Sequence, residues 1–167
     1  MTRTFPVYDI PAIDNEGARR GLLIERFHAY LEKHYQQLHH AHRHSFYHLV
    51  LFTRGAGTHT IDFVTYPVRA GQVYFMIPGQ VHSWHFEGEV DGYIVHFNES
   101  LFTSFLQDGQ YLEWFHFFTG NSEKGGCELP SLVLDQAAAV FEEMLREVVT
   151  AEVYQLTATE RRLVLAT

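Results

Sequence analysis

Three histidines stand at even spacing in the segment His42-Arg43-His44-Ser45-Phe46-Tyr47-His48, and a fourth ends the segment Pro78-Gly79-Gln80-Val81-His82. Side chains alternate between the two faces of a β-strand, so histidines two and six residues apart on one strand project from the same face. Imidazole nitrogens bind first-row divalent metals and also form hydrogen bonds with polar ligands. The spacing therefore predicts one shared site, for a divalent transition metal or for an anionic or hydroxylated ligand. Its expected members are His42, His44, His48 and His82.

The segments around these histidines have the composition of β-strands. They are rich in Val, Ile, Phe and Tyr, which favour pleated and half-buried positions, and glycines or prolines separate them. Strands of this length at regular spacing predict a barrel or a sandwich. The expected strands are 46–54, 57–64, 72–77, 81–87 and 91–97. With 167 residues, of which 46% are hydrophobic, the chain is large enough to close such a core without disulfides.

The first histidine segment resembles the first sequence motif of the cupin superfamily. That motif contains a His-x-His pair, then a Glu and, farther along, a Gly. His42, His44 and Gly55 match these positions, and His48 stands where the family has the Glu. The resemblance implies a mainly β fold, a cupin-like double-stranded β-helix or jelly-roll barrel, followed here by C-terminal α-helices.

The second segment resembles the second cupin motif. Gly71, Gly79 and His82 match it, whereas Ile77 replaces the family's Pro and Phe86 replaces its Asn. In the family the matching histidines hold a metal, so the resemblance makes a divalent transition metal the candidate cofactor. The departures in the two motifs count against the metal chemistry of the cupin enzymes.

A narrower resemblance is carried by HSFYHLVLFTRG at 44–55, GTHTIDF at 57–63 and PGQVHSW at 78–84. These strings resemble the N-terminal sensor domain of AraC-type bacterial transcription regulators, and the similarity extends from about Leu22 to Thr167. The resemblance implies that the barrel binds a small-molecule effector, such as a sugar or an organic acid, and that the following helices form a homodimer. It also implies a separate helix-turn-helix DNA-binding domain. We therefore expect the chain to be a fragment truncated before that domain.

After the last expected strand, the apolar residues change to helical spacing. Leu101 and Phe102 begin a short amphipathic helix, and the aromatic residues of 111–118 are expected to pack back over the barrel. A longer helix is predicted to begin at Asp135, with one broad apolar stripe over 135–151. The members of this stripe are Ala137, Val140, Phe141, Met144, Leu145, Val148 and Val149.

The apolar stripe has two expected uses. It could cover the barrel within one chain or pair with its twofold mate, and the family resemblance favours a homodimer through the 135–151 helix. A second helix start is predicted at 157–160, where Thr-Ala-Thr-Glu matches a capping box. The chain is therefore expected to consist of a barrel domain over 1–126 and a helical dimerisation segment over 127–167.

Charge and cysteine content limit the partners and the compartment. The chain has 12 Lys and Arg against 20 Asp and Glu, a net charge of −8. A DNA-binding surface needs clustered Lys and Arg, so DNA is expected to be contacted only through a domain absent from this chain. The single Cys127 fits a reducing compartment, and the N-terminus lacks an apolar signal segment, so the protein is predicted to be cytoplasmic. No apolar run is long enough to span a bilayer, and no membrane partner is expected.

The favoured function is the effector-sensing and dimerisation domain of an AraC-type transcription regulator. The predicted ligand-binding residues are His42, His44, His48, His82 and Trp84; Trp84 lies two residues from His82 and shares its strand face. One alternative is a metal-dependent cupin enzyme, such as a dioxygenase or isomerase, and another is a stand-alone small-molecule-binding cupin. Histidines that bond only each other, the backbone or water would be purely structural. No nucleophile or phosphate-binding motif is present, so no catalytic residues are predicted.

Overall fold

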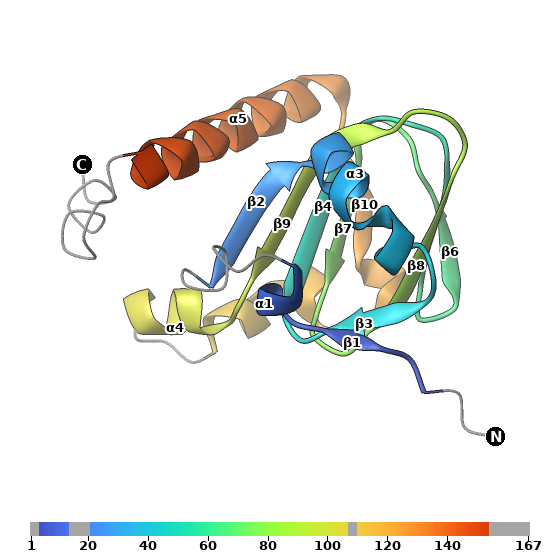
Figure 1. The fold of residues 1–167 in the computed structure, drawn as a ribbon, viewed down its shortest axis with the longest axis horizontal. Helices are drawn as coiled ribbons and strands as arrows, with labels where there is room; N and C mark the ends of the chain where they lie inside the picture. Colours follow the sequence, from blue (N-terminus) through green and yellow to red (C-terminus); the bar gives the residue numbers. More distant parts are fainter. Residues whose placement is uncertain (1–3, 14–20, 107–109, 154–167) are drawn as a thin grey trace.

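The computed structural model describes residues 4–13, 21–106 and 110–153, which form a mainly β fold (Figure 1). Two five-stranded sheets build it. The first has the order β1 (Val7–Tyr8), β3 (His42–His44), β8 (Val81–Phe86), β5 (Gly57–Ile61) and β6 (Val64–Pro67). The second has the order β10 (Gly126–Glu128), β7 (Gln72–Met76), β4 (Tyr47–Arg54), β9 (Asp91–Phe97) and β2 (Leu22–Arg26). Side chains from both sheets share one buried core, which confirms the predicted cupin-like jelly-roll barrel.

The strand predictions agree with the structure except at one turn. Four of the five predicted strands match β4, β7, β8 and β9 to within one residue at each end. The fifth prediction, 57–64, begins correctly at Gly57 but extends too far, because the chain turns at Asp62 and Phe63, between β5 and β6. Both residues have positive φ, 45° and 71°, which costs free energy for residues other than Gly. The Asp62 carboxylate offsets that cost, since it accepts hydrogen bonds from the Val81 N–H and from Gln80 Nε2.

The expectation that His42, His44 and His48 share one strand is also wrong. His42 and His44 lie on β3, which pairs with β8 in the first sheet, whereas His48 lies on β4 in the second sheet. The chain crosses between the sheets at Ser45 and Phe46, because a strand that passes a barrel corner must change sheets. All three imidazoles still point inward, and none is more than 2% exposed.

The barrel interior next to α3 (Phe27–Leu38) is aromatic. The fully buried ring of Phe27 lies 5.0 Å from Phe52 on β4, 5.4 Å from Trp84 on β8 and 5.7 Å from Phe86 on β8, measured between centroids. Because these rings come from both sheets, α3 fills the end of the barrel where β4 and β8 finish. The buried histidines of these two strands, His48 and His82, lie at the strands' other ends. The interior therefore has an aromatic layer and a histidine layer.

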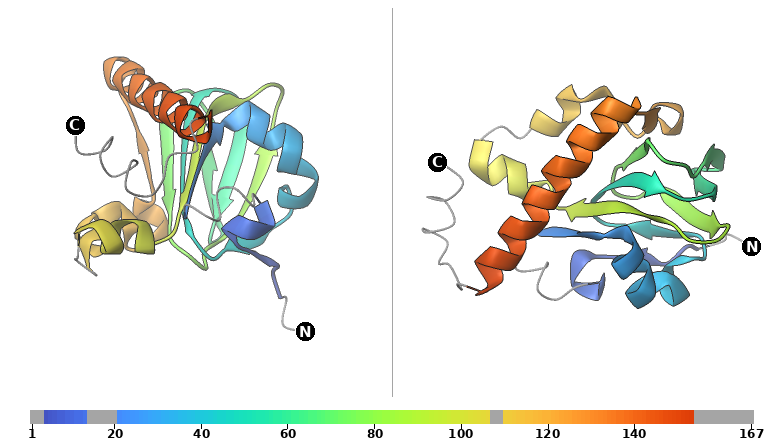
Figure 2. Two further views of the ribbon diagram at one scale, coloured as in Figure 1. Left: turned by 60° about the vertical axis from the view of Figure 1, so that its left-hand side comes forward. Right: turned by 90° about the horizontal axis from the view of Figure 1, so that it is seen from above.

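The helix α5 (Ser131–Val153) crosses the outer face of the second sheet (Figure 2). The Tyr93 ring on β9 stacks on Phe141 with centroids 5.0 Å apart. The members of the predicted stripe that pack on the sheet are Ala137, Phe141, Met144, Leu145 and Val148. Val140 faces away and is 56% exposed, and the side chain of Val149 lies outside the described part. The stripe thus covers the barrel within one chain, which is one of its two expected uses.

The start of α5 differs from the prediction. The helix begins at Ser131 and not at Asp135, which lies inside it. Pro130 explains the difference: proline favours a helix start because its missing N–H has no intrahelical partner there, and its carbonyl accepts the Leu134 N–H at 2.9 Å. The second predicted helix start, at 157–160, lies outside the described residues.

Shorter elements complete the cover of the second sheet. These are α4 (Ser100–Leu106), η1 (Tyr111–Trp114) and η2 (His116–Phe118), while α1 (Ile10–Ile13) and η3 (Ser122–Lys124) lie elsewhere. Leu112 is buried beside Phe97, so 111–118 packs back over the barrel as predicted. The expected domain boundary between 126 and 127 falls inside β10, which pairs with β7. None of the helices in the described ranges combines the length and apolarity needed to cross a membrane.

Candidate functional site

Six histidines form a buried layer inside the barrel, and each is at most 2% exposed. They come from five strands of both sheets, β3, β4, β5, β8 and β9. The members of this histidine layer are His42, His44, His48, His59, His82 and His96. The structure thus brings together the four histidines expected from the sequence. It adds His59 and His96, which sequence reasoning missed although each occupies an inward position of a predicted strand.

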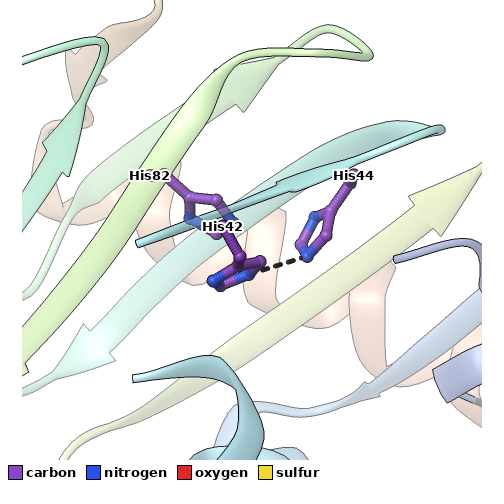
Figure 3. Close-up of side chains that lie close together, drawn as sticks. All are labelled: His42, His44 and His82. Atoms are coloured by element: carbon purple, nitrogen blue, oxygen red, sulfur yellow. Dashed lines mark hydrogen bonds between the residues drawn. The ribbon is translucent and has the colours of Figure 1, made fainter. Parts of the chain in front are cut away.

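One group in the layer joins β3 to β8 (Figure 3). His42 and His82 are directly opposite in the antiparallel pair, with ring centroids 4.2 Å apart. His42 Nε2 and His44 Nε2 are hydrogen-bonded at 3.0 Å, the dashed line in Figure 3. His42 Nδ1 also bonds to the backbone carbonyl of His40 at 2.7 Å. Both nitrogens of His42 therefore already have partners.

A second group joins His44 to the other sheet. His48 on β4 and His96 on β9 are directly opposite, and their rings stack with centroids 4.8 Å apart. The ring of His44 lies 5.2 Å from His48 and 5.4 Å from His96. Phe46 stacks on His44 at 4.4 Å and lies 4.5 Å from His96, so an apolar ring borders both imidazoles.

Trp84 separates the histidine layer from the aromatic layer. It is 3% exposed, and its ring lies 5.0 Å from His82 and 5.8 Å from His48. On its other side it meets Phe27 and Phe86. Its Nε1 atom is buried without a partner in the described structure. Trp84 therefore lies where the sequence placed it, against the histidines, and offers them one N–H donor.

Burial keeps these histidines neutral. Removal from water lowers the pKa of His59 to about 3 and that of His96 to about 3, and neighbouring histidines act in the same direction. The same desolvation lowers the pKa of His42, and lowers the pKa values of His44, His48 and His82 further below the usual range. A neutral imidazole has one N–H donor and one lone pair, and the lone pair can bind a metal where it is free.

Many of these ring nitrogens have no hydrogen-bond partner among the described residues. The unpartnered atoms are His44 Nδ1, both nitrogens of His48, His59 Nδ1, His82 Nε2 and both nitrogens of His96. A buried polar atom without a partner costs about 1–3 kcal/mol, so folded proteins rarely keep several together. The concentration of such atoms in one layer is typical of a binding site.

The donor set fits a metal that prefers nitrogen. Two groups of three histidines, His42–His44–His82 and His44–His48–His96, each have ring nitrogens within 4.8 Å of one another. Neither group includes a carboxylate, since His48 occupies the cupin Glu position. Imidazole ligands suit zinc, copper, nickel and iron, whereas magnesium and calcium require oxygen ligands. A metal held here would act as a Lewis acid and would attract an anion.

Comparison with solved structures finds oxalate decarboxylase from Bacillus subtilis. One variant of that enzyme has 18% sequence identity and a TM-score of 0.32, with 55% of this chain and 20% of that chain covered. Another structure, concerning its Mn(II) centres, has 11% identity and a TM-score of 0.33, with 66% of this chain and 39% of that chain covered. The matches thus span only a fifth to two fifths of the decarboxylase chains. No curated protein sequence matches.

A family model gives a decisive comparison. The model of the AraC-like ligand binding domain matches residues 28–165. This range includes the whole histidine layer, all of α3 except its first residue and the described part of α5. It covers most of the 167-residue chain. The chain therefore belongs to the AraC-like ligand-binding domain family.

Proposed function

We propose that this domain senses a small-molecule effector inside the barrel and controls the DNA-binding domain of an AraC-type transcription regulator. Membership of the ligand-binding family supports the sensing role. The single observation that carries the site is the set of unpartnered ring nitrogens in the histidine layer. An effector that bonds to them would recover free energy that the free domain lacks. The expected contacts are His42, His44, His48, His82 and Trp84.

β9 provides the physical route from the site to the helix. His96 points into the histidine layer, whereas Tyr93, three residues earlier, points outward and stacks on Phe141 of α5. The Tyr93 hydroxyl donates a hydrogen bond to Glu142 at 2.7 Å, and Arg26 pairs with the same carboxylate. A displacement of β9 at the site would therefore change the position of α5 on the sheet.

The signal can be no larger than the difference in effector affinity between two states. If the effector binds better when α5 takes one position on the sheet, it shifts the population toward that position. The role of the barrel is then to couple the occupancy of the histidine layer to the position of α5, and α5 leads toward the C-terminal side of the chain.

A homodimer through α5 is part of the proposal. The inner stripe packs on the barrel, so the outer face of the helix must make the contact. That face exposes Leu132, Val133 and Val140, which are 70%, 41% and 56% exposed. Symmetric isologous pairs are the commonest oligomers, and exposed apolar side chains favour such a pairing.

Thermal unfolding tests the sensing role. The chain without a His tag is melted with sugars, organic acids and divalent metals in turn. A ligand specific to the folded state and present at about 100 times its Kd adds about 2.7 kcal/mol, roughly 5–10 °C for a domain of this size. His82→Gln should lose the shift, while the exposed control His85→Gln should keep it. Equal shifts in both variants, or none with any ligand, would reject the site.

A reporter assay tests the regulatory role separately. The domain is joined to a DNA-binding domain that needs dimerisation, and transcription is measured with and without the ligand found by melting. Ligand-dependent transcription supports the regulator. Binding without any transcriptional response favours a stand-alone binder, and turnover of a bound organic acid in the presence of metal favours the cupin enzyme.

A further inference from the structure

We propose that His44, His48 and His96 form a binding site for a divalent transition metal. This set shares two members with the four histidines expected from the sequence and replaces the others by His96, which belongs to neither histidine motif. It does not depend on the regulatory role, because it rests on the geometry of the histidine layer alone.

The distribution of free nitrogens favours this set. His48 and His96 have both ring nitrogens without partners, and His44 has Nδ1 free. In the alternative set, both nitrogens of His42 are bonded, and His82 Nδ1 is bonded to His59 Nε2 at 3.1 Å. A metal at His42–His44–His82 would therefore have to displace an existing hydrogen bond at His42. In the set His44–His48–His96, both nitrogens of His48 and of His96 are free.

The strands hold this set rigidly. β4 and β9 are central in their sheet, with β7 and β2 on either side, and His48 and His96 face each other directly in the β4–β9 register. Phe46 packs on both His44 and His96 and limits how far those rings can turn. Ligands placed on paired central strands and locked by packing are the arrangement that gives a precise metal site.

The spacing of the three rings suits a metal ion between them. The three rings lie in mutual contact, at centroid separations of 4.8, 5.2 and 5.4 Å, and none is accessible to water beyond 2%. Metal–nitrogen bonds of about 2.1 Å place tetrahedral ligand nitrogens roughly 3.4 Å apart. The donor nitrogens lie within 4.8 Å of one another. Small ring rotations that move these nitrogens by about an ångström would therefore bring them to the distances that a tetrahedral metal requires.

Charge determines which metal and which fourth ligand the set would take. Three neutral imidazoles leave the +2 charge of the ion uncompensated, and the set contains no carboxylate. A small anion, such as hydroxide or a carboxylate, would complete the coordination. The all-nitrogen set points to zinc, cobalt, nickel or copper and disfavours magnesium and calcium.

Cobalt(II) titration of the untagged 167-residue chain tests the proposal, with visible absorption as the readout and equilibrium dialysis with zinc as a second measurement. We expect a single tight site with the intense bands of a low-coordinate cobalt centre. His48→Gln and His96→Gln should weaken binding at least about 100-fold, more than the loss of an outer-shell residue does. His42→Gln and His82→Gln, the matched controls from the same layer, should keep the spectrum.

The opposite pattern would overturn the proposal: binding lost in His42→Gln and His82→Gln but kept in His96→Gln would assign the metal to the other set. Absence of binding by the wild-type chain would also overturn it. Circular dichroism checks that each variant folds. If His96→Gln does not fold, imidazole nitrogen NMR of the wild-type chain gives the answer without substitution. Zinc should then shift the ring nitrogens of His48 and His96, and a shift confined to His42 and His82 would contradict the inference.

Discussion

Lowering the pH should destabilise this domain strongly, because the buried histidine layer must stay neutral. Burial lowers the pKa of His59 to about 3, whereas an unfolded chain titrates near 6.5. As the pH falls below about 6.5, the unfolded chain takes up protons that the folded domain cannot bind. The stability contributed by neutral histidine is therefore complete above that pH and is lost progressively down to about pH 3.

The magnitude follows from the two pKa values. A pH of 5 is about 1.5 units below the pKa of histidine in the unfolded chain. Each buried histidine that stays neutral in the folded domain therefore lowers the free energy of unfolding by about 2 kcal/mol at this pH. His59 and His96, both with a pKa lowered to about 3, together cost about 4 kcal/mol. The rest of the layer shifts in the same direction. Total stabilities of about 5–15 kcal/mol are typical, so the domain should unfold in mild acid.

Urea unfolding at pH 8, 7, 6 and 5 with a chelator present measures this effect. His59→Gln removes one titrating group, so the loss of stability between pH 8 and 5 should be about 2 kcal/mol smaller in the variant than in the wild type. His85→Gln is the control, since His85 is exposed. Identical pH dependence in the wild type and His59→Gln would refute the reasoning, as would a wild-type stability that stays constant down to pH 5.

Three further predictions concern α5 and the charge of the domain. Val140→Glu on the outer face should convert dimers to monomers in sedimentation without loss of stability, whereas Met144→Glu should unfold the domain because Met144 packs on the sheet; dimers unchanged by Val140→Glu would exclude that face. Tyr93→Phe should cost about 1–2 kcal/mol in urea unfolding because it removes the bond to Glu142, and an unchanged midpoint would show that the bond adds nothing. With a net charge of −8, the chain should give no sequence-specific gel shift; a salt-sensitive, selective shift would contradict this.

The barrel and four of its inward histidines could be predicted because their signals are local. Alternation along a strand and the two motif spacings gave His42, His44, His48 and His82, whose positions in one interior the structure confirms. Their role in binding stays a prediction. The change of sheet between His44 and His48 could not be predicted, because the corner at Ser45 and Phe46 contains no Gly or Pro to mark it.

His59 and His96 were missed because their importance depends on register between distant strands. His96 joins the layer because β9 pairs with β4 so that it faces His48. His59 joins it because β5 pairs with β8 and places it opposite Trp84. A single sequence gives the inward face of each strand but not the strand that lies beside it.

The sequence of β4 also bears on the position of α5. β4 contains the continuous apolar run Leu49-Val50-Leu51-Phe52, in which inward and outward residues are both apolar. Strands of that kind are covered on both faces. The run indicates that both faces of β4 are covered, and α5 provides this cover at Leu51. The predicted start of α5 was wrong because it relied on Asp135 as a capping residue and not on Pro130, which precedes Ser131.

The order of strands in the two sheets has a kinetic consequence. Leu22 pairs with Phe97 and His42 pairs with His82, so much of the barrel joins segments far apart in the chain. All-β chains with such distant pairings fold on the millisecond-to-second scale, because long loops must close before their contacts form. Throughout that delay the chain's 12 histidines are open to solvent. A metal ion present during refolding would bridge histidines that the native strands keep apart, so the domain should refold faster from a metal-free solution.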